Sequence, residues 1–154
     1  MSAMSSKKTR KFSLAVQYAS KARLMPTRAQ LRRWIKVALQ CDMRMTLRIV
    51  DEAEGRELNR KYRGKDYATN VLTFAYGDAG QPLTGDVAIC APVVEKEAAG
   101  QRKDLFAHYA HLAIHAALHL QGYGHENDAD AAEMEALETA LMVKLRHSNP
   151  YQAK

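Results

Sequence analysis

The sequence contains few cysteines and no long apolar run. Its two cysteines, Cys41 and Cys90, are far apart, so they form neither a disulfide framework nor a Cys-x-x-Cys metal or redox motif. It has no run of about 18 apolar residues that would span a bilayer, and no apolar secretory segment follows the polar N-terminus. We therefore expect a cytoplasmic protein with no membrane contact and no disulfide-linked partner.

Internal repeats, linkers and low-complexity segments are also lacking, so nothing divides the 154 residues into separate units. A chain of this length buries roughly 68–70% of the surface that its unfolded form exposes, which allows a core of its own. Hydrophobic residues make up 47% of the chain and charged residues 26%, as in ordinary globular proteins. We expect one domain over residues 1–154, with residues 1–10 as a flexible basic tail.

Charge is distributed very unevenly along the chain. Residues 1–65 hold 17 Lys and Arg against 5 Asp and Glu, whereas residues 66–154 hold 6 against 12, so the formal charges are +12 and −6. Clustered positive charge supplies most non-specific affinity for nucleic acids. The pattern suits a basic half that attracts a polyanion and so brings it to the histidines of the acidic half. A merely solvated basic surface is the alternative interpretation.

Periodicity predicts an α+β fold. Apolar residues alternate with polar ones in strand patterns at residues 12–18 and 43–50, and two short β-type runs occupy residues 71–76 and 86–90. Apolar residues recur at helical spacing over residues 27–40, and we expect further helices over residues 51–62, 104–120 and 128–145. The sequence thus predicts a small mixed sheet of about four strands packed with about four to five helices.

Several residues indicate where these elements begin and end. Thr27 and Gln30 form a capping-box pattern, Asp51 is placed to cap the second helix, and Gly122 stops the third. The last two strands flank a turn-rich stretch, so we expect them to pair antiparallel. Its turn residues are Gly77, Asp78, Gly80 and Pro82.

Three histidines have the spacing of a metal site. His115 and His119 are four residues apart in the predicted helix, so both imidazoles project from one face toward a common ion. Gly122 lets the chain leave the helix in a left-handed conformation and return with His125. Neutral imidazoles suit zinc, and three protein ligands leave a fourth position for water, as in catalytic sites.

The same spacing occurs in the zinc-peptidase signature HExxHxxGxxH, which indicates a zincin-like arrangement around the three histidines. In that signature the glutamate is the general base, and here its position holds Ala116. A peptidase of this type would lack its base. His108 and His111 lie on the same predicted helix without a glycine turn, so we expect rim or solvated side chains, and we expect His147 to be solvated.

Two longer blocks extend the histidine pattern. Residues 115–125 read HAALHLQGYGH. Residues 58–74 read LNRKYRGKDYATNVLTF, and residues 85–87 read GDV. These blocks resemble the bacterial YbeY family of endoribonucleases, whose corresponding signatures are HGxLHLxGYDH, LNxxYRxxDxxTDVLSF and GDI. The matches occur in family order over about residues 47–128.

Three positions depart from the family pattern. Ala116 replaces a glycine, which should only stiffen the helix. Gly124 and Asn70 each replace an aspartate, and if either aspartate orients a ligand or water, metal affinity or rate would fall roughly 10- to 100-fold. Three other aspartates are available as substitutes: Asp66, Asp86 and Asp128.

The resemblance implies a zinc-dependent endoribonuclease that hydrolyses phosphodiester bonds of single-stranded RNA in ribosomal RNA maturation and ribosome quality control. One Zn²⁺ per chain would be held by His115, His119 and His125. The family's functional arginine corresponds to Arg63, which with His115 forms the expected catalytic set. Its guanidinium would hold the phosphate and stabilise developing charge. The general base is unassigned: Asp86 is one candidate, and a structural capping role for Asp86 is the alternative.

The implied partners are ribosomal RNA and components of the small ribosomal subunit. Arg60, Lys61 and Lys65 flank the functional arginine and are the expected RNA-binding residues. A second basic group would extend the RNA track, although a solvated helix face accounts for it better: Arg28, Arg32, Arg33 and Lys36.

Two other functions stay open at this point. A zinc peptidase would cleave peptides without RNA. A non-catalytic RNA-binding protein of the ribosome would still bind RNA after the three histidines are changed to alanine.

Overall fold

A four-stranded mixed sheet organises the computed structural model, which describes residues 10–76 and 82–146. The strands are β1 (Phe12–Ala19), β2 (Met43–Val50), β3 (Val71–Tyr76) and β4 (Leu83–Cys90), in the order β1-β2-β4-β3. β2 runs parallel to β1 and β4, and β3 runs antiparallel to β4. The predicted four strands, their mixed sheet and the antiparallel last pair are confirmed.

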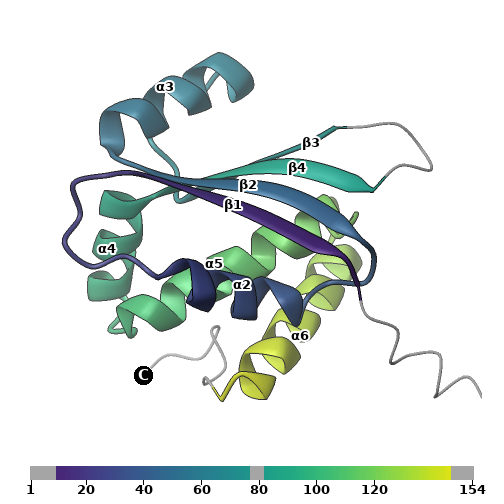
Figure 1. Ribbon diagram of the computed structural model, residues 1–154. Coiled ribbons are helices and arrows are strands. Elements are labelled where there is room, and N and C mark those ends of the chain that lie inside the picture. The colour runs from purple at the N-terminus through teal and green to yellow at the C-terminus, as the bar shows by residue number, and fades with distance from the viewer. Residues whose placement is uncertain (1–9, 77–81, 147–154) are drawn as a thin grey trace, which may run out of the picture.

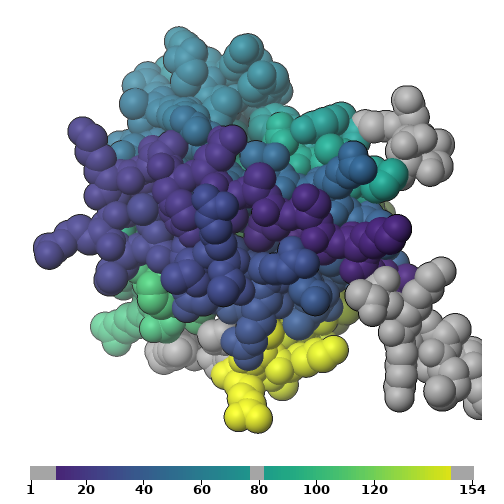
Figure 2. Space-filling model, in the orientation of Figure 1, coloured from purple at the N-terminus to yellow at the C-terminus, as the bar shows by residue number. Residues whose placement is uncertain are grey.

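Five helices accompany the sheet in the described ranges: α2 (Arg28–Lys36), α3 (Glu52–Arg63), α4 (Ala91–Gly100), α5 (Leu105–Leu120) and α6 (Asp128–Lys144). Figure 1 shows α3 on one side of the sheet and the other four helices on the opposite side. The space-filling view in the same orientation shows that β1 and α2, in purple and blue, cover much of the front of the molecule and leave little of α5 visible (Figure 2). None of these helices has the length and apolar character that a bilayer span requires.

The core lies between the sheet and α5. Alternate residues of β2 point to this side, and Met43, Met45, Leu47 and Ile49 are all at most 3% exposed. α5 contacts β3 and β4 as well as α2, α4 and α6, so its side chains are covered on almost every face. A helix enclosed in this way is hydrophobic nearly all round, which explains the absence of an amphipathic stripe in its sequence.

Helix α4 was not predicted from the sequence. It begins at Ala91, directly after the last strand, with Pro92 in its first turn. Proline is well tolerated there because the first backbone N–H groups of a helix have no intrahelical acceptor. Only Val94 and Ala98 of its later residues are buried, so the periodic signal is weak. The helix predicted over residues 27–40 also ends early, at Lys36.

The predicted caps have different outcomes. Thr27 and Gln30 form the reciprocal capping box, with donor–acceptor distances of 3.1 and 2.9 Å. Asp51 occupies the N-cap position of α3 without a side-chain cap bond. Its carboxylate instead accepts hydrogen bonds from the Ser20 hydroxyl and the Lys21 backbone, which ties the segment after β1 to the start of α3.

Three expectations lie outside the described residues: most of the basic tail, which spans residues 1–10; the turn residues Gly77, Asp78 and Gly80; and the solvated His147.

Gly122 is essential to the turn after α5 because its φ is +107°, a conformation that L-residues rarely adopt. Gly122→Ala should lower the free energy of unfolding by roughly 1–2 kcal/mol, since alanine is strained there. Gly100→Ala is the matched control at the end of α4, where a new Cβ meets nothing within 4 Å. It should be neutral or stabilising. Urea denaturation of both variants tests this, and equal stabilities would contradict the strained-turn argument.

Candidate metal centre

Helix α5 and the turn after it bring the three predicted ligands together. The ring centroids of His115 and His119 are 6.3 Å apart, and those of His115 and His125 are 5.1 Å apart. The first pair follows from one helical turn, whereas the second depends on the turn at Gly122, which reverses the chain. His119 and His125 are exposed, and 22% of the His115 side chain is exposed.

All three histidines line one cavity of about 400 Å³. Arg63 lines the same cavity from the end of α3, where Gly64 with φ +70° ends the helix directly after it. The remaining lining residues come from Tyr62 and the first four positions of β3. The cavity therefore lies across the β3 edge of the sheet, between the end of α3 and one face of α5.

The guanidinium of Arg63 has no hydrogen bond or ion pair within the part of the chain that the structure describes. Its neighbours on α3 differ in this respect. Arg56 donates to Asp66 at 2.8 Å, and Arg60 donates to Glu57 at 3.2 Å. Arg63 is therefore a cation that lines the histidine cavity without a carboxylate partner among residues 10–76 and 82–146.

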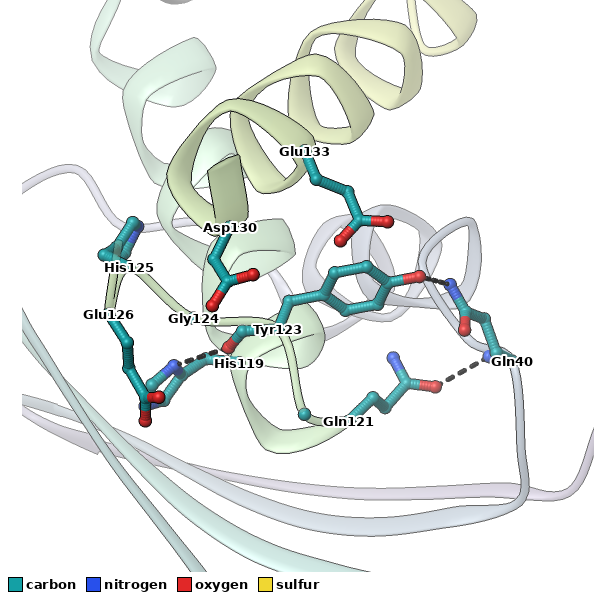
Figure 3. Close-up of a pocket in the computed structure, with 10 residues that line it drawn as sticks. Gln40, His119, Gln121, Tyr123, Gly124, His125, Glu126, Asp130 and Glu133 are labelled. Carbon is teal, nitrogen blue, oxygen red and sulfur yellow. Dashed lines mark hydrogen bonds between the residues drawn. The ribbon is translucent and has the colours of Figure 1, made fainter. Parts of the chain in front are cut away.

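The turn that carries His125 is hydrogen-bonded to the segment after α2. Figure 3 shows Tyr123 and Gln121 reaching Gln40: the Tyr123 hydroxyl accepts from the Gln40 amide at 3.0 Å, and the Gln121 amide oxygen accepts from the Gln40 backbone at 2.7 Å. His119 Nδ1 lies 3.0 Å from the Tyr123 carbonyl oxygen. A carbonyl only accepts, so Nδ1 carries the proton and His119 Nε2 keeps a lone pair.

A carboxylate that sequence reasoning missed lies beside the first histidine. Glu138 of α6 is fully buried, with its Oε2 2.6 Å from His115 Nδ1 and its Oε1 2.7 Å from His111 Nε2. One signal could have identified it. Met134, Glu138 and Met142 are spaced four residues apart and form the buried face of α6, so the helical period places this glutamate in the core.

A family model described as endoribonuclease YbeY matches residues 12–146, which is most of the chain. The chain belongs to the YbeY family. A YbeY endoribonuclease of Nitrosospira multiformis is 52% identical over 94% of this chain and 84% of its own length. That of Thiobacillus denitrificans is 53% identical over 91% and 96%. That of Cupriavidus necator is 58% identical over 83% and 65%, so this chain spans about two thirds of that longer relative.

A solved structure supports the same fold. The solution structure of TM1509 from Thermotoga maritima aligns with a TM-score of 0.56 and 24% identity over 90% of this chain and 99% of that one. At this identity the likeness concerns the fold alone. The YbeY-like α+β architecture therefore agrees with the family assignment from the sequence.

The prediction that His108 and His111 are rim or solvated residues is wrong. They are only 5% and 8% exposed, because α4 and α6 cover the faces of α5 that the sheet leaves open. His108 Nε2 lies 2.9 Å from a Glu97 carboxylate oxygen, and His111 shares Glu138 with His115. Both are therefore buried polar groups with specific carboxylate partners.

Other candidates are placed away from the histidine cavity. Asp86, the possible general base, accepts a hydrogen bond from the Tyr76 hydroxyl at 2.9 Å and lines a separate cavity of about 320 Å³. Asp66 is exposed and held by Arg56. Asp128 lies in the exposed first turn of α6. The structure thus gives none of the three a contact with the predicted ligands.

The two positions at which the YbeY pattern has an aspartate, Asn70 and Gly124, have different surroundings. Asn70 donates to Glu97 at 3.1 Å, so it belongs to the polar group around His108. Gly124 lines a second cavity, of about 540 Å³, beside His119 and His125, and a Cβ at Gly124 would meet nothing within 4 Å. The space for a carboxylate at that position is therefore present, but the carboxylate is not.

The predicted RNA-binding residues gather at the end of α3 and just after it. Arg60 and Lys61 are exposed in its last turn, and the Lys61 Nζ is 5.3 Å from the centroid of the Tyr62 ring. Lys65 is the second residue after the helix. On α2 the basic residues are less uniform. Arg32 donates to the Phe12 carbonyl at 3.0 Å and thereby joins α2 to β1.

Ala116 is fully buried. The residue next to this predicted ligand therefore lies in the core and does not line the histidine cavity. A carboxylate there would have to be buried among apolar side chains, at a cost of several kcal/mol. The zinc-peptidase alternative loses support for this reason as well as for the missing base.

Burial lowers the pKa of His108 below its usual value of 6.5, and hydrogen bonding to Glu97 only partly opposes this. The folded YbeY chain therefore binds the His108 proton less readily than the unfolded chain, so stability from this group is lost as the pH falls below about 6.5. The free energy of unfolding should fall less in His108→Gln than in the wild type between about pH 7.5 and pH 5.5. Urea titrations with a chelator present measure this, and parallel pH profiles would contradict it.

Proposed function

We propose that this chain cleaves single-stranded RNA with a bound metal ion and acts in ribosomal RNA maturation and ribosome quality control. Family membership makes it an endoribonuclease, a hydrolase that acts on RNA. The observation that carries the proposed site is one cavity shared by three histidines and an arginine that no carboxylate of the described residues pairs with. Ribosomal RNA and components of the small subunit are the proposed partners, which implies a cytoplasmic reaction.

The donor chemistry of the site fits a zinc ion, one per chain, held by His115, His119 and His125. No three His, Cys, Asp or Glu side chains in the described ranges already form a metal-binding group, so the ligand set rests on chemistry rather than on a closed geometry. The Nδ1 atoms of His115 and His119 are both engaged in hydrogen bonds, which leaves each Nε2 as a free lone pair. Neutral imidazoles of this kind are preferred zinc ligands.

Held by His115, His119 and His125, a metal ion would supply Lewis acidity for the attack of water on the phosphodiester. Arg63 binds the scissile phosphate from the other side of the cavity with two guanidinium N–H groups and stabilises the charge that builds on its oxygens. Because no carboxylate neutralises Arg63 among the described residues, its full charge is available to the phosphate. Arg60, Lys61 and Lys65 hold neighbouring phosphates at the end of α3.

The first test concerns the metal. The purified wild type should contain about one zinc per chain, a chelator should abolish its RNA cleavage, and zinc should restore it. His119→Ala should lose both metal and cleavage, because it removes one of three ligands. His108→Gln is the matched control on the same helix and should retain both. Elemental analysis and a cleavage assay on ribosomal RNA give the result, and unchanged cleavage by His119→Ala would refute the metal mechanism.

The second test concerns the arginine. Arg63→Ala should slow single-turnover cleavage of a single-stranded ribosomal RNA fragment by about 10²- to 10³-fold, the usual effect of losing a group that stabilises transition-state charge. Arg56→Ala is the matched control: it removes the same charge from the same helix, but Arg56 is paired with Asp66. It should change the rate only a few-fold. Equal losses in the two variants would show that only the charge of α3 matters.

The same assays separate the remaining alternative. A non-catalytic RNA-binding protein would bind the fragment equally well after His115, His119 and His125 are all changed to alanine, and neither form would cleave it. We expect cleavage by the wild type alone. RNA binding should fall mainly in variants that lose the basic residues at the end of α3.

A further inference from the structure

The carboxylate of Glu138 joins two histidines of α5 from a different helix. It is fully buried, and its two oxygens lie 2.7 Å from His111 Nε2 and 2.6 Å from His115 Nδ1. Both distances are short for hydrogen bonds between nitrogen and oxygen, as expected when the acceptor is a carboxylate. Glu138 therefore connects a histidine outside the proposed ligand set to one inside it.

This arrangement decides which nitrogen of His115 carries a proton. An ionised carboxylate only accepts hydrogen bonds, so both imidazoles donate, His115 through Nδ1 and His111 through Nε2. With its proton on Nδ1, His115 presents Nε2 as a lone pair, the form that binds a metal ion. The ring is also held in place, because Nδ1 is fixed to a side chain that cannot move into solvent.

The surroundings keep the carboxylate itself in one orientation. Met134 and Met142, one turn on either side of Glu138 along α6, are also fully or almost fully buried. One carboxylate oxygen is occupied by His111, which directs the other toward His115. His111 and the packing of α6 on α5 thus fix Glu138, and Glu138 in turn fixes His115.

We propose that Glu138 is the residue that positions His115 for metal binding and thereby sets the metal affinity of the site. The proposal rests on the proposed function, because it assumes that His115 is a ligand. Glu138 itself does not line the histidine cavity, so it acts through His115 and not on the RNA. Carboxylates that accept a hydrogen bond from a metal-binding imidazole fix its tautomer and raise its basicity.

The chain contains its own control for this proposal. Glu97 of α4 accepts a hydrogen bond from His108 at 2.9 Å on the same helix α5, but His108 is not among the proposed ligands. Glu97→Gln and Glu138→Gln therefore make the same chemical change in two histidine–carboxylate pairs. Only the second pair contacts a proposed ligand.

The experiment measures zinc affinity by competition with a chelator in the wild type, Glu97→Gln and Glu138→Gln. Glutamine has the size of glutamate, but its amide cannot accept hydrogen bonds from both histidines. We expect Glu138→Gln to bind zinc about 10- to 100-fold more weakly than the wild type, and Glu97→Gln to bind within a few-fold. Equal affinities in all three proteins would overturn the proposal while leaving the metal site intact.

A second measurement makes the result independent of how well the variants fold. Two-bond ¹H–¹⁵N correlations of the imidazoles in the metal-free wild type report the tautomer of each histidine. His115 should carry its proton on Nδ1, and this preference should weaken in Glu138→Gln or in the shorter but still charged Glu138→Asp. A wild-type His115 protonated on Nε2 would overturn the proposal. If the wild type binds no zinc, the proposed function fails, and the tautomer alone then decides whether Glu138 orients His115.

Discussion

The burial of α5 is the constraint on which the rest of the structure depends. This helix lies between the sheet and three other helices, yet it carries four histidines along one side of its length. A buried polar group without a partner is costly, so the packing of the neighbouring helices has to supply acceptors. α4 provides Glu97 for His108, and α6 provides Glu138 for His111 and His115. The contacts that stabilise the core therefore also orient a histidine of the proposed metal site.

The proposed site is divided between a rigid part and an attached part. His115 and His119 are held by a helix that is part of the core, whereas His125 follows a turn. Gln121 ties that turn to the segment after α2 through two hydrogen bonds, with Ala38 and Gln40, and to α5 through a third, with Ala117. Sites built on regular elements hold their geometry better than sites built on loops. Here the hydrogen bonds of Gln121 hold the turn that carries His125 against both neighbouring segments.

Arg63 enters the site from the opposite layer of the molecule. α3 lies on the face of the sheet that the other helices leave free, and its last residue borders the cavity across the β3 edge. The end of α3 can reach the cavity because β3, which pairs antiparallel with β4, is the edge strand of the sheet. The basic end of α3 therefore lies next to the histidines although 52 residues separate Arg63 from His115.

Much of this protein is determined by local sequence. Strand and helix patterns in the sequence predict all four strands and four of the five described helices, and the need for positive φ explains Gly122. The spacing of His115, His119 and His125 already indicates a shared site. Tertiary structure alone decided that His108 and His111 are buried, that Asp86 lies in another cavity, and that Glu138 contacts His115. The reason is physical: periodicity describes one element at a time, whereas a buried hydrogen bond depends on which elements pack together.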